Sequence, residues 1–116
     1  MMDEETHQRV NEVTLLAVQA LLGLISNDVI AVAVNVDVAR VEIIFWAYRH
    51  SSELEDDAEE ATFELDALFS GDHPLIEYTI KIGEPEPRPL ESNVRMIYWA
   101  KSRTPRQNNR EEADVP

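Results

Sequence analysis

Two stretches of the chain repeat apolar residues at the spacing of an amphipathic helix, residues 4–25 and residues 52–69. Their apolar positions are Val10, Val13, Ala17, Ala20, Leu21 and Leu24 in the first and Leu54, Ala58, Ala61, Leu65 and Leu68 in the second. Acidic residues crowd the start of the first, where the helix dipole favours negative charge. In the second, Ser52 and Glu55 have the spacing of a capping box, and residues 70–74 include the helix-ending Gly71 and Pro74.

Four shorter stretches are rich in β-branched and aromatic residues and predict strands: residues 29–36, 41–50, 75–82 and 94–101. The first two are close enough to form an antiparallel hairpin. Residues 83–93 separate the last two, and their alternating prolines predict a stiff, extended loop. The order helix, hairpin, helix, hairpin predicts an α+β fold with a four-stranded, mainly antiparallel sheet and both helices on one face.

The length of 116 residues suits one domain, which we expect to cover residues 1–101. Residues 102–116 carry almost nothing apolar and predict a disordered polar tail.

Alternation along the predicted strands assigns their side chains to two faces of the sheet. The helix-facing side should receive Ile30, Val32, Val34, Val41, Ile43, Phe45, Ile76, Tyr78, Ile80, Val94, Met96 and Tyr98, and the opposite side Ile44, Trp46, Tyr48, Ile97 and Trp99. An exposed apolar patch of this kind usually marks an interface, and Trp and Tyr dominate binding hot spots. Two explanations stay open: the face binds a partner, or the Pro-rich loop or a second subunit covers it.

Charge narrows the choice of partner, because 23 Asp and Glu against ten Lys and Arg leave a formal net charge of −13. Proteins that bind nucleic acid neutralise phosphates with basic residues, so nucleic acid and anionic membranes are poor partners. A cationic protein is favoured, because a field of this sign speeds its encounter. The second predicted helix concentrates the charge in Glu53, Glu55, Asp56, Asp57, Glu59, Glu60, Glu64 and Asp66. Such a helix is either a solvated face or a docking site.

Catalytic chemistry has little support in this sequence. The histidines, His7, His50 and His73, lie in unrelated places, the glycines are single, and cysteine is absent. Paired carboxylates without a histidine predict no specific metal site, and we expect no cofactor. An enzyme would require a pocket that joins His50 or His73 to the carboxylates near Glu55. The acidic start and the absence of a long apolar segment predict a cytoplasmic protein.

Several stretches resemble the small acidic immunity proteins of contact-dependent growth inhibition and polymorphic toxin systems in bacteria. They are ALLGLISNDVIAVAVNV, VEIIFWAYRHSSELEDDAEEATFEL, LIEYTIKI, EPEPRPL and MIYWAKS, within residues 16–102. The resemblance implies a non-catalytic antidote that binds the C-terminal domain of a cognate toxin, often a basic nuclease. The basic residues Arg103, Arg106 and Arg110 have no counterpart that the resemblance explains.

We therefore predict an immunity protein that binds and neutralises a basic toxin domain in the cytoplasm. The expected partner-binding residues are Glu53, Glu55, Asp56, Asp57, Glu59, Glu60, Glu64, Trp46, Tyr48 and Trp99. The alternative is a homodimeric, non-catalytic structural or adaptor module that pairs through the aromatic face of the sheet.

Overall fold

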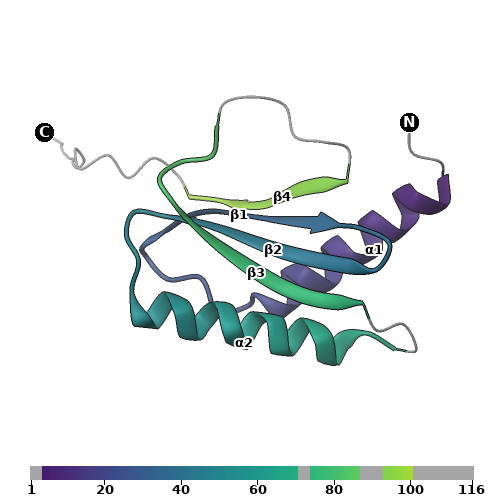
Figure 1. Cartoon of the computed structure of the whole chain (residues 1–116), viewed down its shortest axis with the longest axis horizontal. Helices are drawn as coiled ribbons and strands as arrows, with labels where there is room; N and C mark the ends of the chain where they lie inside the picture. The colour runs from purple at the N-terminus through teal and green to yellow at the C-terminus, as the bar shows by residue number, and fades with distance from the viewer. Residues whose placement is uncertain (1–3, 71–73, 87–92, 101–116) are drawn as a thin grey trace, which may run out of the picture.

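The computed structural model describes residues 4–70, 74–86 and 93–100, which form two helices and four strands (Figure 1). In chain order they are α1 (Glu4–Ala20), β1 (Val29–Val36), β2 (Arg40–Ala47), α2 (Ser52–Leu68), β3 (Leu75–Ile82) and β4 (Val94–Trp99). The predicted class, α+β with two helices and four strands, is confirmed. The expected tail at residues 102–116 lies outside the described residues.

The strands lie in the order β3-β2-β1-β4 and form a mixed sheet. β1 pairs antiparallel with both β2 and β4, whereas β2 pairs parallel with β3. The first predicted hairpin is therefore present, but the second is wrong, because β3 and β4 occupy the two opposite edges of the sheet. The reason is physical: α2 crosses over from β2 to β3, and such a crossover places consecutive strands parallel.

Both helices begin or end at positions that differ from the predicted ones. α1 ends at Ala20 instead of residue 25, since Gly23 adopts a φ of 81°, a left-handed conformation that stops a helix. α2 is capped by Ser51, whose side-chain oxygen accepts a hydrogen bond from the Leu54 backbone N–H at 3.1 Å. The predicted capping box of Ser52 and Glu55 is thus wrong by one residue, and it leaves the Glu55 side chain available for other contacts.

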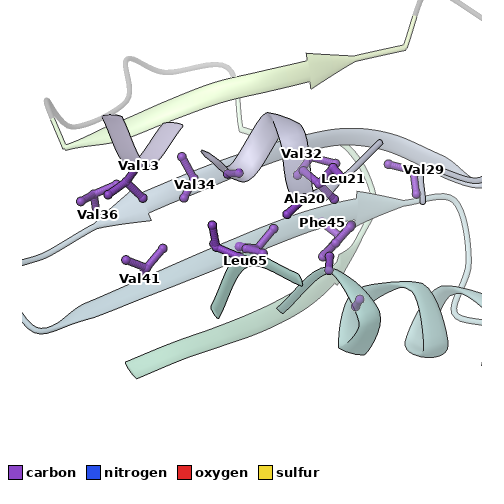
Figure 2. Packing of buried hydrophobic residues seen from close by; sticks show 14 of the residues in the cluster. Val13, Ala20, Leu21, Val29, Val32, Val34, Val36, Val41, Phe45 and Leu65 are labelled. Atoms are coloured by element: carbon purple, nitrogen blue, oxygen red, sulfur yellow. The ribbon is translucent and has the colours of Figure 1, made fainter. Parts of the chain in front are cut away.

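The main core lies between the helices and the sheet (Figure 2). The largest fully buried side chains are Phe45, Ile43, Leu54, Leu65, Val10, Val29, Val32, Val34 and Val41. In α2 the predicted apolar stripe is buried at Leu54, Ala58, Ala61 and Leu65. Both helices therefore cover one face of the sheet, as their spacing predicted.

Two bulges alter which residues face the helices. The register shifts between Val29 and Ala31, which leaves Ile30 as an extra residue in β1. It shifts again between Val32 and Ala33, which leaves Ile97 as an extra residue in β4. An extra residue reverses the side on which its neighbours point. Ile30, Val94 and Met96 consequently pack on the far face, while Ile97 packs against the helix-side core, so these four predictions were wrong.

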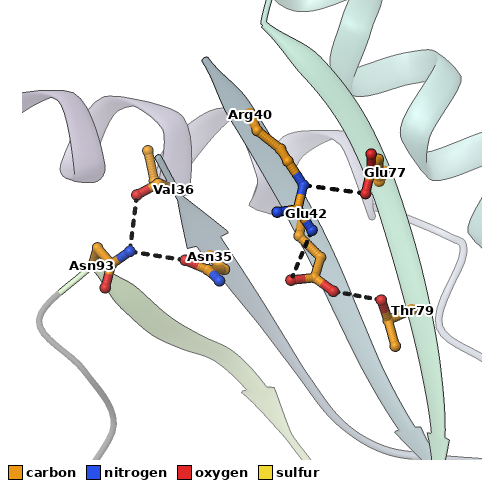
Figure 3. A network of polar contacts seen from close by, with 7 residues as sticks. All are labelled: Asn35, Val36, Arg40, Glu42, Glu77, Thr79 and Asn93. Carbon is orange, nitrogen blue, oxygen red and sulfur yellow. Dashed lines mark hydrogen bonds and ion pairs between the residues drawn. The ribbon is translucent and has the colours of Figure 1, made fainter. Parts of the chain in front are cut away.

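The far face of the sheet is apolar at one end and polar at the other. Ile30, Ala31, Ala33, Ile44 and Trp46 form a second buried cluster there. At the other end, Arg40 pairs with Glu77 at 3.2 Å, the Thr79 hydroxyl donates to Glu42, and Asn93 donates to Asn35 at 2.9 Å (Figure 3). This network ties β4 to β1 and β3 to β2.

Candidate protein-binding surface

α2 presents a carboxylate surface on the side that faces away from the core. Its buried stripe leaves the other positions to solvent, and the Ser51 cap and the acidic first turn favour the start of the helix. The exposed members are Glu53, Asp56, Glu59, Glu60, Glu64 and Asp66, while Glu55 and Asp57 are partly exposed. We call this set the acidic face of α2.

Most of these carboxylates have no basic partner. Within the part of the chain that the structure describes, the only ion pair formed by the acidic face joins Glu55 to His50. Each pair of like charges one helical turn apart destabilises the helix by about 0.2–0.5 kcal/mol. Partial burial, with the nearby charges of Asp56 and Glu60, raises the pKa of Asp57 above its usual value. A cationic partner would relieve this repulsion.

Glu55 differs from the rest of the acidic face, because the fold already uses its side chain. Its Oε1 accepts a hydrogen bond from the Tyr78 hydroxyl at 2.7 Å, and its Oε2 lies 2.7 Å from Nε2 of His50. The Tyr78 hydrogen bond, together with His50, lowers the pKa of Glu55. The same hydrogen bond raises the pKa of Tyr78 to about 12. We therefore interpret Glu55 as a residue that joins α2 to β3.

This contact also bears on catalysis, since it brings His50 next to the Glu55 carboxylate. The side chains of His50 and Glu55 are 55% and 39% exposed, so the pair lies on the surface. General acid–base chemistry requires a positioned substrate as well as a titratable pair. The pair joins the segment before α2 to the first turn of that helix, and the Tyr78 hydrogen bond joins the same carboxylate to β3.

Phe63 is a candidate contact residue that the sequence reasoning missed. It lies on α2, 71% exposed, one helical turn from Glu59 and Glu60 and next to Glu64. The helical spacing of the sequence predicts that Phe63 is exposed, because it falls outside the stripe that faces the core. That stripe consists of Leu54, Ala58, Ala61 and Leu65. An exposed aromatic side chain surrounded by carboxylates suits a partner that is cationic around an apolar pocket.

The three aromatic residues that the sequence assigned to the open sheet face lie in different surroundings. Trp46 is on that face but only 7% exposed, and the Lys81 ammonium lies 5.8 Å from its ring centroid. Tyr48 is 50% exposed and follows β2, a few residues before α2. Trp99 is 54% exposed on the edge strand β4. The Pro-rich segment proposed as a cover falls largely on residues 87–92, outside the described residues.

The described residues hold no group of three or more histidine, cysteine, aspartate or glutamate side chains that could bind a metal ion. A search of the same part of the chain found no helix with the length and apolar character needed to cross a membrane.

A comparison with protein families finds a match. The family model described as MafI2 immunity protein matches residues 10–102, from the middle of α1 to just past β4. No curated protein matches the chain.

Proposed function

This chain belongs to the MafI2 immunity protein family, and from that premise we propose that it neutralises a cognate toxin by binding it one to one through the acidic face of α2. The family implies a toxin protein as the partner. The observation that supports α2 as the contact is a row of carboxylates that, apart from Glu55, have no basic partner among the described residues, on a helix that packs against the core on its other side.

Charge indicates what kind of toxin fits this helix. An enzyme that acts on nucleic acid holds phosphates with lysine and arginine, so its substrate groove is cationic. A rigid row of carboxylates can occupy such a groove and exclude the substrate. We therefore propose a basic toxin domain, with a nuclease as the leading candidate, that is inhibited by blocked access to its substrate.

In this proposal the carboxylates and the aromatic side chains have different roles. Glu60 and Glu64 steer the toxin through long-range attraction, which raises association rates by about tenfold to a thousandfold at low salt. Phe63 then supplies apolar contact between them, and Tyr48 lies near the start of the same helix. Inhibition by binding requires no catalytic group, and action in the cytoplasm fits a chain without cysteine.

Charge reversal on α2 tests the docking surface. We expect Glu60→Lys with Glu64→Lys to slow association with the toxin domain about tenfold or more at low salt and to flatten its salt dependence. Stopped-flow or surface plasmon measurements over a range of salt concentrations give both quantities.

The matched control is Glu5→Lys with Glu12→Lys, because both carboxylates are exposed on α1 and the change in net charge is identical. We expect this pair to slow association much less. Equal effects of the two pairs would mean that only the net charge matters, and an unchanged rate for the α2 pair would remove α2 as the docking surface.

A further inference from the structure

A second exposed surface, on α1, has the opposite character to the acidic face of α2. Residues 13–27 contain no charged side chain, although the chain as a whole is 28% charged. Leu15, Val18 and Leu22 recur at helical spacing on the outer side of this segment and are 70%, 42% and 73% exposed. Solvent exposure of large aliphatic side chains in such a row is typical of an interface.

A groove of about 330 Å³ runs beside these residues, between the end of α1 and strand β4. Its lining includes Val18, Leu22, Ile25, Ile97 and Tyr98. The groove contains no carboxylate among its lining residues. A protruding aliphatic row and an apolar groove thus lie next to each other; together we call them the α1 surface.

We propose that the α1 surface is a twofold interface between two copies of this chain. A twofold interface brings the same patch of both copies together, so it requires a protrusion and a matching hollow within one patch. The α1 surface has both, because Leu15 and Leu22 project beside the groove. Each copy can place these leucines against the groove of the other.

Charge favours a second copy over other occupants of the α1 surface. Two copies that each carry a net charge of −13 repel each other, and the repulsion is smallest where neither presents a carboxylate. A cationic toxin gains no electrostatic attraction from an uncharged patch. The α1 surface is therefore the place where copies of this acidic chain can approach most closely.

The position of the α1 surface leaves most of the acidic face of α2 free. α1 packs on β1, β4 and α2, whereas α2 also packs on β3, at the other edge of the sheet. The end of the α1 surface comes near the start of α2, because Ile25 and Glu53 line one pocket. Glu60 and Glu64 lie about two and three helical turns farther along α2. A dimer formed through α1 leaves this farther part of the acidic face open in each copy.

Sedimentation velocity of the full chain over low to high micromolar concentrations tests the proposal. We expect a dimer that strengthens as salt is added, since salt screens the repulsion between copies. Leu15→Ser with Leu22→Ser should weaken self-association about tenfold or more, as two truncated apolar contacts imply. Phe63→Ser is the matched control, because its 71% exposure equals that of Leu15 within a percent, and it should leave the dimer intact.

Toxin affinity is measured for the same variants, and thermal unfolding checks that each variant is folded. Loss of the dimer with unchanged toxin affinity supports the proposal. It is overturned if the wild-type chain stays monomeric at every concentration, if the leucine variant stays dimeric, or if the leucine variant loses toxin binding instead. A monomeric wild-type chain, or a leucine variant that stays dimeric, leaves the toxin-binding proposal for α2 intact, since that is measured on different residues.

Discussion

Glu55 shows at the level of one residue how the fold can occupy a side chain that the sequence assigned to a partner. It lies in the acidic run with Glu53 and Asp56, and its spacing from Ser52 predicted only a local capping contact. Only the packing of β3 beside α2 brings the Tyr78 hydroxyl to 2.7 Å from its carboxylate. The residue therefore stabilises the joint between a helix and a strand.

This hydrogen bond predicts how stability depends on pH. Because the folded pKa of Glu55 lies below its ordinary value of 4.5, the folded state binds the proton less tightly than the unfolded chain. The stabilisation is therefore present above about pH 4.5 and is lost as pH falls through the folded pKa. Tyr78→Phe removes the largest cause, so we expect a smaller loss of stability between neutral and acidic pH than in wild type. Urea unfolding between neutral and acidic pH measures this loss of stability, with Tyr98→Phe on the distant strand β4 as control. Identical acid profiles for Tyr78→Phe and wild type would contradict the assignment.

Phe63 carries a separate prediction about the lifetime of the toxin complex. Truncation of a central aromatic contact mainly speeds dissociation, whereas loss of charge mainly slows association. We expect Phe63→Ala to raise the dissociation rate about tenfold or more and to leave the association rate within about twofold of wild type. Leu15→Ala, which removes an equally exposed side chain from α1, should change neither rate. A dissociation rate that Phe63→Ala does not alter would place Phe63 outside the interface.

At the level of the elements, the start of α2 depends on which serine caps the helix. The sequence offers two adjacent serines, and the Ser-x-x-Glu spacing favoured Ser52. In the structure Ser51 has the extended backbone of a cap, with φ −149° and ψ 159°, and accepts the Leu54 N–H. The choice follows from packing, because Leu54 must point into the core at 0% exposure.

The two serines give a matched pair of substitutions. Ser51→Ala should lower the free energy of unfolding by about 0.5–2 kcal/mol through loss of the cap. Ser52→Ala, one residue later and exposed, should change it by about 0.5 kcal/mol or less. Chemical denaturation of both variants measures the difference, and a larger cost at Ser52 would restore the capping box as the better description.

The strands show a related limit of local reasoning. Alternation assigned most of the sheet correctly, including Val32, Val34, Val41, Ile43 and Phe45 on the helix side. It failed at Ile30 and around Ile97, where a single extra residue shifts the register against β2 and β1. A bulge depends on how two strands meet, so neither strand reveals it alone.

For the molecule as a whole, the main feature is the separation of two kinds of surface. Charge gathers on α2 at one edge of the sheet, and uncharged apolar side chains gather on α1 at the other. Under the two proposals, a dimer holds two toxin domains at once.

Local patterns by themselves determined the two helices, the four strand segments, the α+β class and the concentration of negative charge on α2. These properties depend on neighbours within a few residues, where helix and strand periodicities act. Tertiary structure alone decided the strand order, the bulges, the burial of Trp46 and the engagement of Glu55. Each of those depends on segments far apart in the chain, whose meeting is set by how the whole core packs.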